Sequence, residues 1–418
     1  MSTMFFQSTQ VNTHWDTWVY EYNGKFYLYY LSEIDGRWAG FGVAVSDNGV
    51  VWEDQGVVLT ASEKMKDYLG TGSIWKSPTF EKDHKFYVNY SEWQQTESQE
   101  KQQRIFFAES YDLIHWRKLE KVFDIDNQLY QQEGRWDCIY PLTRKEGGYF
   151  GTWTATPLER TQLNGGIGFG YSENGIDWKA LKNEGIIPPA DESGAVTYKN
   201  GKYYAMFGCF ADGMAMYAYS ADQFNGPYVR CEKHNPLLTP GTTYFSRFVE
   251  FDGQLLLNHH AISKKKAATG FFYCYMAPLK RVEIEQNNIR LKYWEGNEYL
   301  KQLGTVKASQ FDPKACIFLE GKMVQGESIQ IGRHAPLTLE LADNQIIARE
   351  ENQHAMHFAI PKDRETAKSE TVQIKMLLKQ WVLEVYIDNL YAFSYSLAQP
   401  FDGTLVASGQ TIWEIADL

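Results

Sequence analysis

The sequence lacks the features of a membrane protein, a nucleic-acid-binding protein or a disulfide-bonded scaffold. No apolar run approaches the ~18 residues that a transmembrane helix needs. The net charge of the 418 residues is −11, whereas a nucleic-acid partner calls for a basic stripe. The five cysteines are scattered, with no Cys-x-x-Cys pair, as is typical of reduced thiols. The first ten residues, MSTMFFQSTQ, have neither the basic nor the apolar segment of a secretory signal. We therefore expect a cytoplasmic protein with no nucleic-acid or membrane partner.

Motifs that bind nucleotides or metals are missing as well. Residues 165–170 (GGIGFG) lead into a predicted strand instead of a helix, which argues against a dinucleotide site. Residues 70–73 (GTGS) have no lysine and no following helix, so they do not form a phosphate loop. His259 and His260 are adjacent on a predicted strand and would point to opposite faces, so they cannot share one metal. The sequence predicts no cofactor and no metal.

Aromatic residues are abundant, and one short motif recurs. The chain has 13 Trp and 27 Tyr, which suit β-sheets and also form platforms for sugar rings. Residues 46–52 read SDNGVVW, residues 110–116 SYDLIHW and residues 172–178 SENGIDW, and a looser copy, SADQFNGPY, begins at Ser220. Such spacing is typical of a repeat architecture built from small sheets. We interpret each copy as the hairpin turn and outer strand of one β-propeller blade.

Strand-like segments before each copy define the domains. Residues 24–30 (GKFYLYY), 85–90 (KFYVNY), 148–154 (GYFGTWT) and 201–207 (GKYYAMF) alternate as strands do, and a fifth unit spans 248–277. Later strand-like runs cover 337–341, 371–378, 381–387 and 391–397, with a tight turn at Asp388-Asn389. The sequence therefore predicts an all-β chain. A five-bladed propeller would occupy residues 1–285, a linker 286–304 and a C-terminal β-sandwich 305–418.

Three acidic residues stand at the beginnings of predicted blades. Asp16 (HWDTW) begins the first blade, Asp137 (GRWDC) the third and Glu192 (ADESG) the fourth. Because the innermost strands surround the propeller axis, we expect these side chains to converge on one pocket. Glycoside hydrolysis uses two carboxylates in different protonation states, and crowding of like charges raises the pKa of one of them. The alternative is that the aspartates cap turns and Glu192 is a solvated loop residue.

These segments together resemble the propeller glycosidases of the furanosidase superfamily, and most closely glycoside hydrolase family 32, whose members carry a C-terminal β-sandwich. Residues 70–73 resemble the family's Ser-Gly-Ser segment, and residues 383–386 (LEVY) resemble its Val-Glu-Val-Phe strand. Arg135-Trp136-Asp137 is similar to its Arg-Asp-Pro segment, and Glu192-Ser193 to its Glu-Cys segment. The resemblance covers nearly the whole chain.

The resemblance implies a retaining hydrolase that releases a terminal furanosyl unit, with β-fructofuranosyl as the candidate, from short oligosaccharides. Asp16 would be the nucleophile, Glu192 the general acid/base and Asp137 the residue that stabilises the transition state. The family's first motif is Asn-Asp-Pro-Asn-Gly, whereas residues 15–19 read WDTWV. Because these changes fall where the family binds fructose, they bear on the sugar more than on the reaction.

Two other functions fit the same pattern. The related family 43 uses similar acids but inverts, acts on arabinofuranosides and xylosides, and would make Asp16 a general base. The carboxylate separation distinguishes the two, at roughly 5 Å for retention and 6.5 Å or more for inversion. A propeller that binds carbohydrate without cleaving it, or one that binds protein through an exposed rim, is the alternative outside enzymes. The oligomeric state stays open.

Further residues are candidates for contact with a small carbohydrate substrate. Tryptophans near blade beginnings could stack on sugar rings, although for each of them a place in the core is the commoner role. Arg247 and one of His259 and His260 are candidates for binding hydroxyls, and we expect His259. The complete set of substrate-binding candidates is Trp15, Trp18, Ser73, Trp75, Trp93, Arg135, Trp136, Arg247 and His259.

Overall fold

The computed structural model of the chain consists almost entirely of β-strands. It describes residues 4–62, 68–95, 101–159, 163–231, 236–243, 245–285, 287–302, 311–334, 336–351, 353–360, 371–408 and 414–417. The helical segments are short, and they are α1 (Phe80–Asp83), η1 (Phe210–Asp212) and η2 (Glu295–Gln302). Across these ranges, no helix combines the length and the apolar character needed to cross a bilayer.

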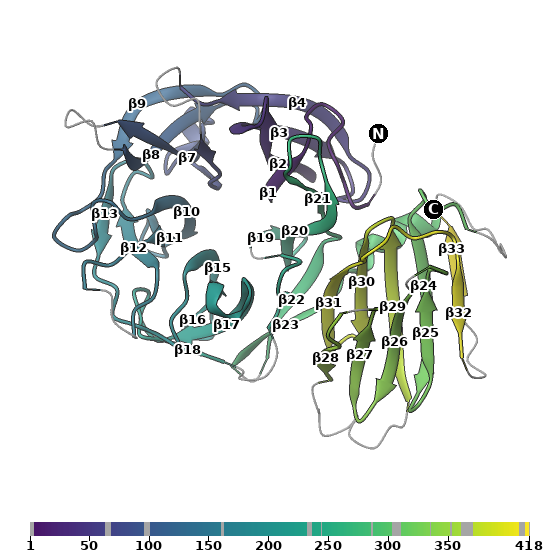
Figure 1. Ribbon diagram of the computed structural model, residues 1–418. Coiled ribbons are helices and arrows are strands. Elements are labelled where there is room, and N and C mark those ends of the chain that lie inside the picture. Colours follow the sequence, from purple (N-terminus) through teal and green to yellow (C-terminus); the bar gives the residue numbers. More distant parts are fainter. Residues whose placement is uncertain are drawn as a thin grey trace.

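Five sheets stand in a ring around a central axis (Figure 1), and their strands are antiparallel apart from the parallel pair β14 and β18. The chain fills the sheets one after another. Strands β1, β10, β15 and β19 lie at the edges of their sheets that face the axis, whereas β14 lies at the outer edge of the fourth sheet beside β18. The prediction of a five-bladed propeller is confirmed. The strands of the five sheets are β1 (His14–Tyr22), β2 (Lys25–Ile34), β3 (Arg37–Ser46) and β4 (Glu53–Thr60); β5 (Leu69–Gly70), β6 (Ile74–Lys76), β7 (Phe86–Gln95), β8 (Lys101–Ser110) and β9 (Arg117–Phe123); β10 (Trp136–Thr143), β11 (Tyr149–Ala155), β12 (Ile167–Ser172) and β13 (Trp178–Leu181); β14 (Ile186–Ile187), β15 (Glu192–Lys199), β16 (Lys202–Cys209), β17 (Ala215–Ala221) and β18 (Tyr228–Arg230); and β19 (Ser246–Phe251), β20 (Gln254–Lys266), β21 (Phe272–Met276), β22 (Lys280–Glu285) and β23 (Asn288–Tyr293).

The fifth sheet extends beyond the boundary predicted at residue 285. Strand β20 pairs with β19, then with β22 along its first half and with β21 along its second half. Strand β23 pairs with β22 as the outer strand of this sheet. The segment predicted as a linker, 286–304, thus contains β23 and η2. The mixed polar and charged composition of β23 conceals its strand character, because only alternate residues face the core.

The recurring Ser-x-Asn/Asp motif forms the turn between the third and fourth strands of a blade. Ser46, Ser110 and Ser172 each end a third strand, and their hydroxyls accept a hydrogen bond of 2.9 Å from the amide three residues later. The Asn or Asp that stands two positions after each serine accepts a second hydrogen bond, of 2.7–2.9 Å. Its donor is the backbone amide three residues after that Asn or Asp. Because the side chains satisfy the turn's own amides, the motif is a structural requirement of the blade.

The C-terminal domain is a sandwich of two five-stranded sheets, as predicted. Its inner faces enclose a separate hydrophobic cluster that includes Leu339, Ile374 and Phe393. Asp388 and Asn389 both have positive φ and form the tight turn between two strands. One sheet has the order β31-β30-β29-β24-β33 and the other β28-β27-β26-β25-β32. The strands are β24 (Ile317–Val324), β25 (Ser328–Ile331), β26 (Leu337–Ala342), β27 (Gln345–Arg349), β28 (Met356–Ala359), β29 (Thr371–Lys379), β30 (Val382–Ile387), β31 (Tyr391–Ser396), β32 (Leu405–Ala407) and β33 (Glu414–Asp417).

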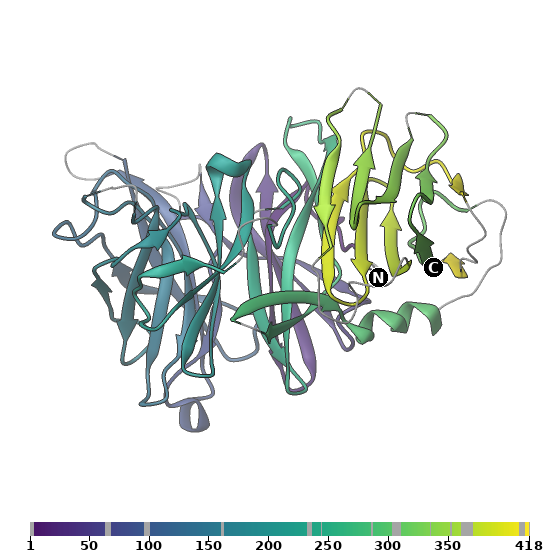
Figure 2. The same ribbon diagram turned by 90° about the horizontal axis from the view of Figure 1, so that it is seen from below.

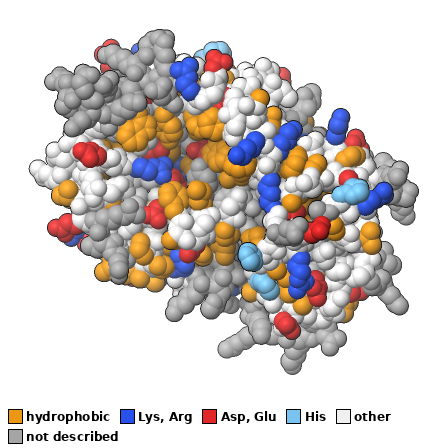
Figure 3. Space-filling view, in the orientation of Figure 1, with side chains coloured by type: hydrophobic (Ala, Val, Ile, Leu, Met, Phe, Trp, Pro, Cys, Tyr) orange, Lys and Arg blue, Asp and Glu red, His pale blue; other side chains and the backbone are white. Residues whose placement is uncertain are grey.

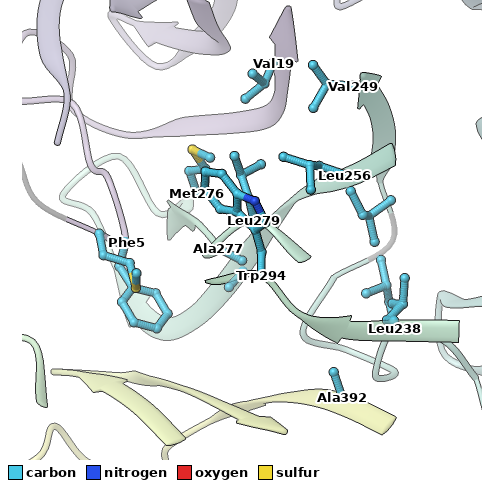
Figure 4. Close-up of a cluster of buried hydrophobic side chains, with 14 of the residues drawn as sticks. Phe5, Val19, Leu238, Val249, Leu256, Met276, Ala277, Leu279, Trp294 and Ala392 are labelled. Carbon is cyan, nitrogen blue, oxygen red and sulfur yellow. The ribbon is translucent and has the colours of Figure 1, made fainter. Parts of the chain in front are cut away.

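The propeller and the sandwich share a buried interface. Figure 2 shows the two domains side by side, and β31 lies against β20 and β23 of the fifth blade. One hydrophobic cluster joins Val19 of the first blade, Leu256 and Trp294 near the fifth, and Ala392 of the sandwich (Figure 4). Burial of such apolar surface contributes about 25 cal/mol per Å², so separation of the domains is costly. In the view of Figure 3, hydrophobic side chains gather around the hollowed centre of the propeller, with charged ones among them.

Candidate active site

The three predicted acids lie at the beginnings of the innermost strands, and an irregularity in the pairing occurs beside each. In β1, Trp15 and Trp18 each pair with a residue of β2. They are three residues apart, whereas their partners are only two residues apart, so β1 contains one extra residue. Strand β10 has the same shift after Asp137, and β15 has it after Ser193. These shifts have the form of β-bulges, which re-aim side chains at the rims of sheets. Asp16 itself has a φ of 34°, a conformation that a non-glycine residue rarely adopts.

Arg135 links two of the acids. Its Nη1 donates to Glu192 Oε2 at 2.6 Å, and its Nη2 donates to Asp137 Oδ2 at 3.1 Å. Both carboxylates are almost fully buried, whereas the Arg135 side chain is 37% exposed. The guanidinium therefore covers the two carboxylates from the solvent side and compensates part of their charge.

Hydrogen bonds fix the two carboxylates from behind. Tyr68 donates to Asp137 Oδ2 at 3.0 Å, and Ser91 donates to its other oxygen. Gln103 holds Ser91 in turn, through a 3.2 Å bond from its amide nitrogen. Thr154 donates to Glu192 Oε1 at 2.9 Å. Both carboxylates are thus held in fixed orientations by neighbouring blades.

Asp16 is less firmly held. Thr71 donates to its Oδ2 at 3.5 Å, and His260 Nδ1 is 3.8 Å from its Oδ1. Burial, followed by the negative charges of Glu192 and Asp137, raises the pKa of Asp16 to about 8. Burial also lowers the pKa of His260 to about 3, so its ring is neutral and does not offset this repulsion. The site therefore holds a proton at neutral pH.

Arg247 is fully buried. Its Nη1 donates to the carbonyl oxygens of Ser193, Gly194 and Ser246 at 2.8–3.1 Å. Its Nε donates to Ser73 Oγ at 3.0 Å. The charge of Arg247 opposes the rise in the pKa of Asp16. Arg247 and Ser73, both predicted to bind substrate, thus hold the strand ends of three blades together.

The predicted aromatic residues divide between pocket and core. Trp18, Trp75 and Trp136 are 0–4% exposed and belong to the hydrophobic clusters between sheets, so the prediction that they contact sugar does not fit their positions. Trp15 is partly exposed and its ring centre is 5.5 Å from that of His260. Trp93 is partly exposed and lies two residues after Ser91, hence on the same face of β7.

Of the two adjacent histidines, the structure brings His260 to the site. His259 points away from the acids, and its Nε2 lies 2.6 Å from Lys280 Nζ. Strand alternation allows only one of the pair to face Asp16, as the sequence indicates, but sequence alone does not tell which one. The choice of His259 is therefore corrected to His260.

Sequence reasoning missed Tyr68, Ser91, Gln103 and Thr154. Two of them had a recognisable signal. Asn89 and Ser91 are polar residues at alternating positions of the buried strand β7, and Thr152 and Thr154 alternate in the same way on β11. Buried polar residues on one face of a strand require partners, and here those partners include the acids and their supports.

In the described part of the chain, no group of three His, Cys, Asp or Glu side chains is arranged to hold a metal ion. Neither a protein-family model nor a curated protein matches the sequence. Solved structures do match, and they share the propeller and sandwich of glycoside hydrolase family 32. The chain therefore has the family 32 fold.

Three of these structures align with all of this chain. Sucrose-6-phosphate hydrolase from Lactobacillus gasseri has a TM-score of 0.77 at 13% identity, with 93% of its own chain covered. A family 32 β-fructofuranosidase from Bombyx mori has a TM-score of 0.73 at 15% identity, with 94% covered. An exo-inulinase from Aspergillus awamori has a TM-score of 0.74 at 10% identity, with 98% covered.

Proposed function

We propose that the protein is a retaining glycoside hydrolase that releases a terminal furanosyl unit, with β-fructofuranosyl as the first candidate, from short oligosaccharides. One observation carries this proposal. Two buried carboxylates, Asp137 and Glu192, bind Arg135, and their negative charges together with burial raise the pKa of a third acid, the partly exposed Asp16, to about 8. Similar structures include a fructofuranosidase in complex with fructose and a fructan 1-exohydrolase in complex with 1-kestose, which supports a small carbohydrate as the partner.

In the proposed reaction, Asp16 attacks the anomeric carbon while Glu192 protonates the departing glycosidic oxygen. The bond from the anomeric carbon to that oxygen breaks, and a covalent glycosyl-Asp16 ester forms. Glu192 then removes a proton from water, which attacks the ester and releases the sugar with its configuration retained. Asp137, oriented by Tyr68 and Ser91, accepts hydrogen bonds from ring hydroxyls.

The proton content of the site matches this reaction. A retaining hydrolase begins its cycle with one proton on the acid and an ionised nucleophile. With the pKa of Asp16 at about 8, the free site already holds one proton, and Arg135 donates a hydrogen bond to Glu192 at 2.6 Å. In our proposal, substrate displaces Arg135 from Glu192, and the proton then passes to Glu192.

The same electrostatics favour a second assignment, in which the roles are reversed. A carboxyl with a raised pKa is the usual general acid, so Asp16 would protonate the leaving group and Glu192 would attack. Substrates with different leaving groups distinguish the two assignments, because a good leaving group needs no protonation.

The test compares Glu192→Gln with Asp16→Asn on sucrose and on an aryl β-fructofuranoside. If Glu192 is the acid, Glu192→Gln loses about 10²- to 10⁴-fold in kcat on sucrose but much less in the glycosylation of the aryl substrate. Asp16→Asn would then lose activity on both. The opposite pattern would reverse the roles, and full activity of both variants on both substrates would contradict the proposed chemistry.

For the location of the enzyme, we propose the cytoplasm. Cys138, Cys209 and Cys274 are buried thiols outside any disulfide. Free thiols are typical of a reducing compartment, and a net charge of −11 does not favour nucleic acid as a partner. Fractionation of cells that express the full-length protein from its own gene, followed by detection with an antibody, tests this location. Recovery in the culture medium would contradict it.

A further inference from the structure

A buried ion pair crosses the interface between the sandwich and the propeller. Lys280 Nζ, from β22 in the fifth blade, lies 2.7 Å from Glu384 Oε2, from β30 in the sandwich, and both side chains are 0% exposed. Ser394 on β31 donates to the other oxygen of Glu384 at 2.6 Å. Burial raises the pKa of Glu384, and Lys280 opposes that rise. Two charges in such a place are expensive to bury, so each depends on its partner.

Lys280 also contacts the strand that carries the site histidine. Its Nζ is 2.6 Å from His259 Nε2, and His259 Nδ1 is 2.9 Å from the carbonyl oxygen of His260. An ammonium group can only donate, so Nε2 of His259 must accept and its proton must lie on Nδ1. Nδ1 then donates to the His260 carbonyl. The pair therefore specifies one tautomer of His259 and fixes the backbone of the next residue.

His260 is the residue whose ring faces Asp16. Its Nδ1 is 3.8 Å from Asp16 Oδ1, and its ring lies against Trp15 and Phe245. An ion pair and two hydrogen bonds thus connect Glu384 in one domain, through Lys280 and His259, to the main chain beside the proposed nucleophile in the other. The side chains of Glu384, Lys280, His259 and His260 are all 0% exposed.

We propose that Lys280 and Glu384 are positioning residues through which the sandwich holds His260, and with it the pocket around Asp16, in place. The effect on catalysis rests on the proposed function, whereas the tautomer of His259 does not. The sandwich would then be a part of the active-site scaffold. Two neutral side chains in place of the pair should leave the domains packed but release His259 from its single tautomer.

The test variant is the double substitution Lys280→Met/Glu384→Gln, which leaves no lone buried charge. The matched control is Lys264→Met/Glu350→Gln. It removes another ion pair across the same interface, 3.1 Å long, without touching His259. Both variants keep the full chain, and thermal unfolding verifies that they are folded.

Two readouts decide the proposal. The first is the tautomer of His259 from ¹⁵N NMR, with the signal assigned by its loss in His259→Gln. We expect the Nδ1–H form in the wild type and the control, and a mixture of tautomers in the Lys280/Glu384 variant. The second is turnover of sucrose or an aryl β-fructofuranoside. We expect kcat to fall about 10- to 100-fold in the Lys280/Glu384 variant, with KM within about twofold, and no such fall in the control.

An Nε2–H form in the wild type, or the same kcat and tautomer in the two double variants, would overturn the proposal. If the Lys280/Glu384 variant does not fold, the wild-type tautomer still decides the hydrogen-bond direction. The single variant His259→Gln, whose side chain cannot titrate, then supplies the kinetic comparison. If the wild type cleaves no glycoside, the proposed function fails, and the NMR result alone decides whether the pair positions His259.

Discussion

Strand β20 lies next to a member of each of two groups of charged side chains, Asp16 and Lys280, and the two groups differ in their balance of charge. On one side are three acids, Asp16, Asp137 and Glu192, and one arginine that contacts two of them directly, Arg135. On the other side Lys280 and Glu384 form one pair with equal and opposite charges. Burial, together with the excess of acid, raises the pKa of Asp16 and leaves a proton available for chemistry. The balanced pair has no such excess and can hold two domains in register.

The largest effect on activity is expected from a substitution among the three acids. Asp16→Asn should lower kcat on sucrose by about 10⁴-fold or more, equivalent to roughly 5.5 kcal/mol of transition-state stabilisation, because the amide cannot form the glycosyl ester. Steady-state kinetics measures the loss. Asp177→Asn, at an exposed carboxylate on blade three, is the control and should keep wild-type kcat. Residual activity of Asp16→Asn within tenfold of wild type would remove Asp16 from the mechanism.

The same substitution should change how stability depends on pH. The pKa of Asp16 is raised in the folded protein, so its contribution to stability is fully present below the ordinary value of 3.8 and is lost as pH rises toward about 8. The wild type should therefore lose about 4 kcal/mol more than Asp16→Asn between pH 5 and pH 9. Chemical denaturation at the two pH values measures this difference. An equal loss of stability in the two proteins would show that folding does not raise the pKa of Asp16.

Breaking the balanced pair at one end should cost stability at every pH between 5 and 9. Glu384→Gln leaves Lys280 buried without a counter-charge, a change that typically costs about 3–5 kcal/mol. The double variant Lys280→Met/Glu384→Gln should recover most of this loss, because it removes both charges. Chemical denaturation of the single and double variants makes the comparison. Equal stability of the two would mean that the pair is not coupled.

The smallest effect is expected far from both groups, in the repeated turn. Ser172→Ala removes one acceptor for the Gly175 amide and should cost about 1 kcal/mol without changing kcat. Ser46→Ala and Ser110→Ala remove the equivalent acceptor and should behave alike. Thermal unfolding measures the cost. A marked loss of kcat in any one of them would give these turns a role beyond the scaffold.

These turns also show what the sequence could predict. Ser46, Ser110 and Ser172 accept hydrogen bonds from the amides of their own turns. The sequence pattern by itself therefore predicts this local structure. Blade count follows from such local patterns, and the acids follow from their places at the beginnings of blades. The predicted end of the propeller lay within the fifth sheet because the polar residues of β23 conceal a strand that only the sheet pairing reveals.

The supports of the site depend on contacts between distant parts of the chain. Ser91 contacts an acid 46 residues away, and Tyr68 contacts the same acid across 69 residues. Whether His259 or His260 faces Asp16 depends on the register of β20 against β19 and β21, which no local pattern specifies. Trp18 and Trp75 belong to the core for the same reason, since burial between sheets is decided by packing.

The stereochemistry of sugar transfer tests the central claim most directly. The protein would be incubated with sucrose in buffer that contains methanol, and the methyl furanoside formed would be identified by NMR, since methyl glycosides do not interconvert in solution. A covalent intermediate on Asp16 predicts methyl β-fructofuranoside, with the configuration of the substrate retained. The α-anomer would contradict the account, because it requires direct attack by a base-activated nucleophile and would make Asp16 or its neighbours general bases.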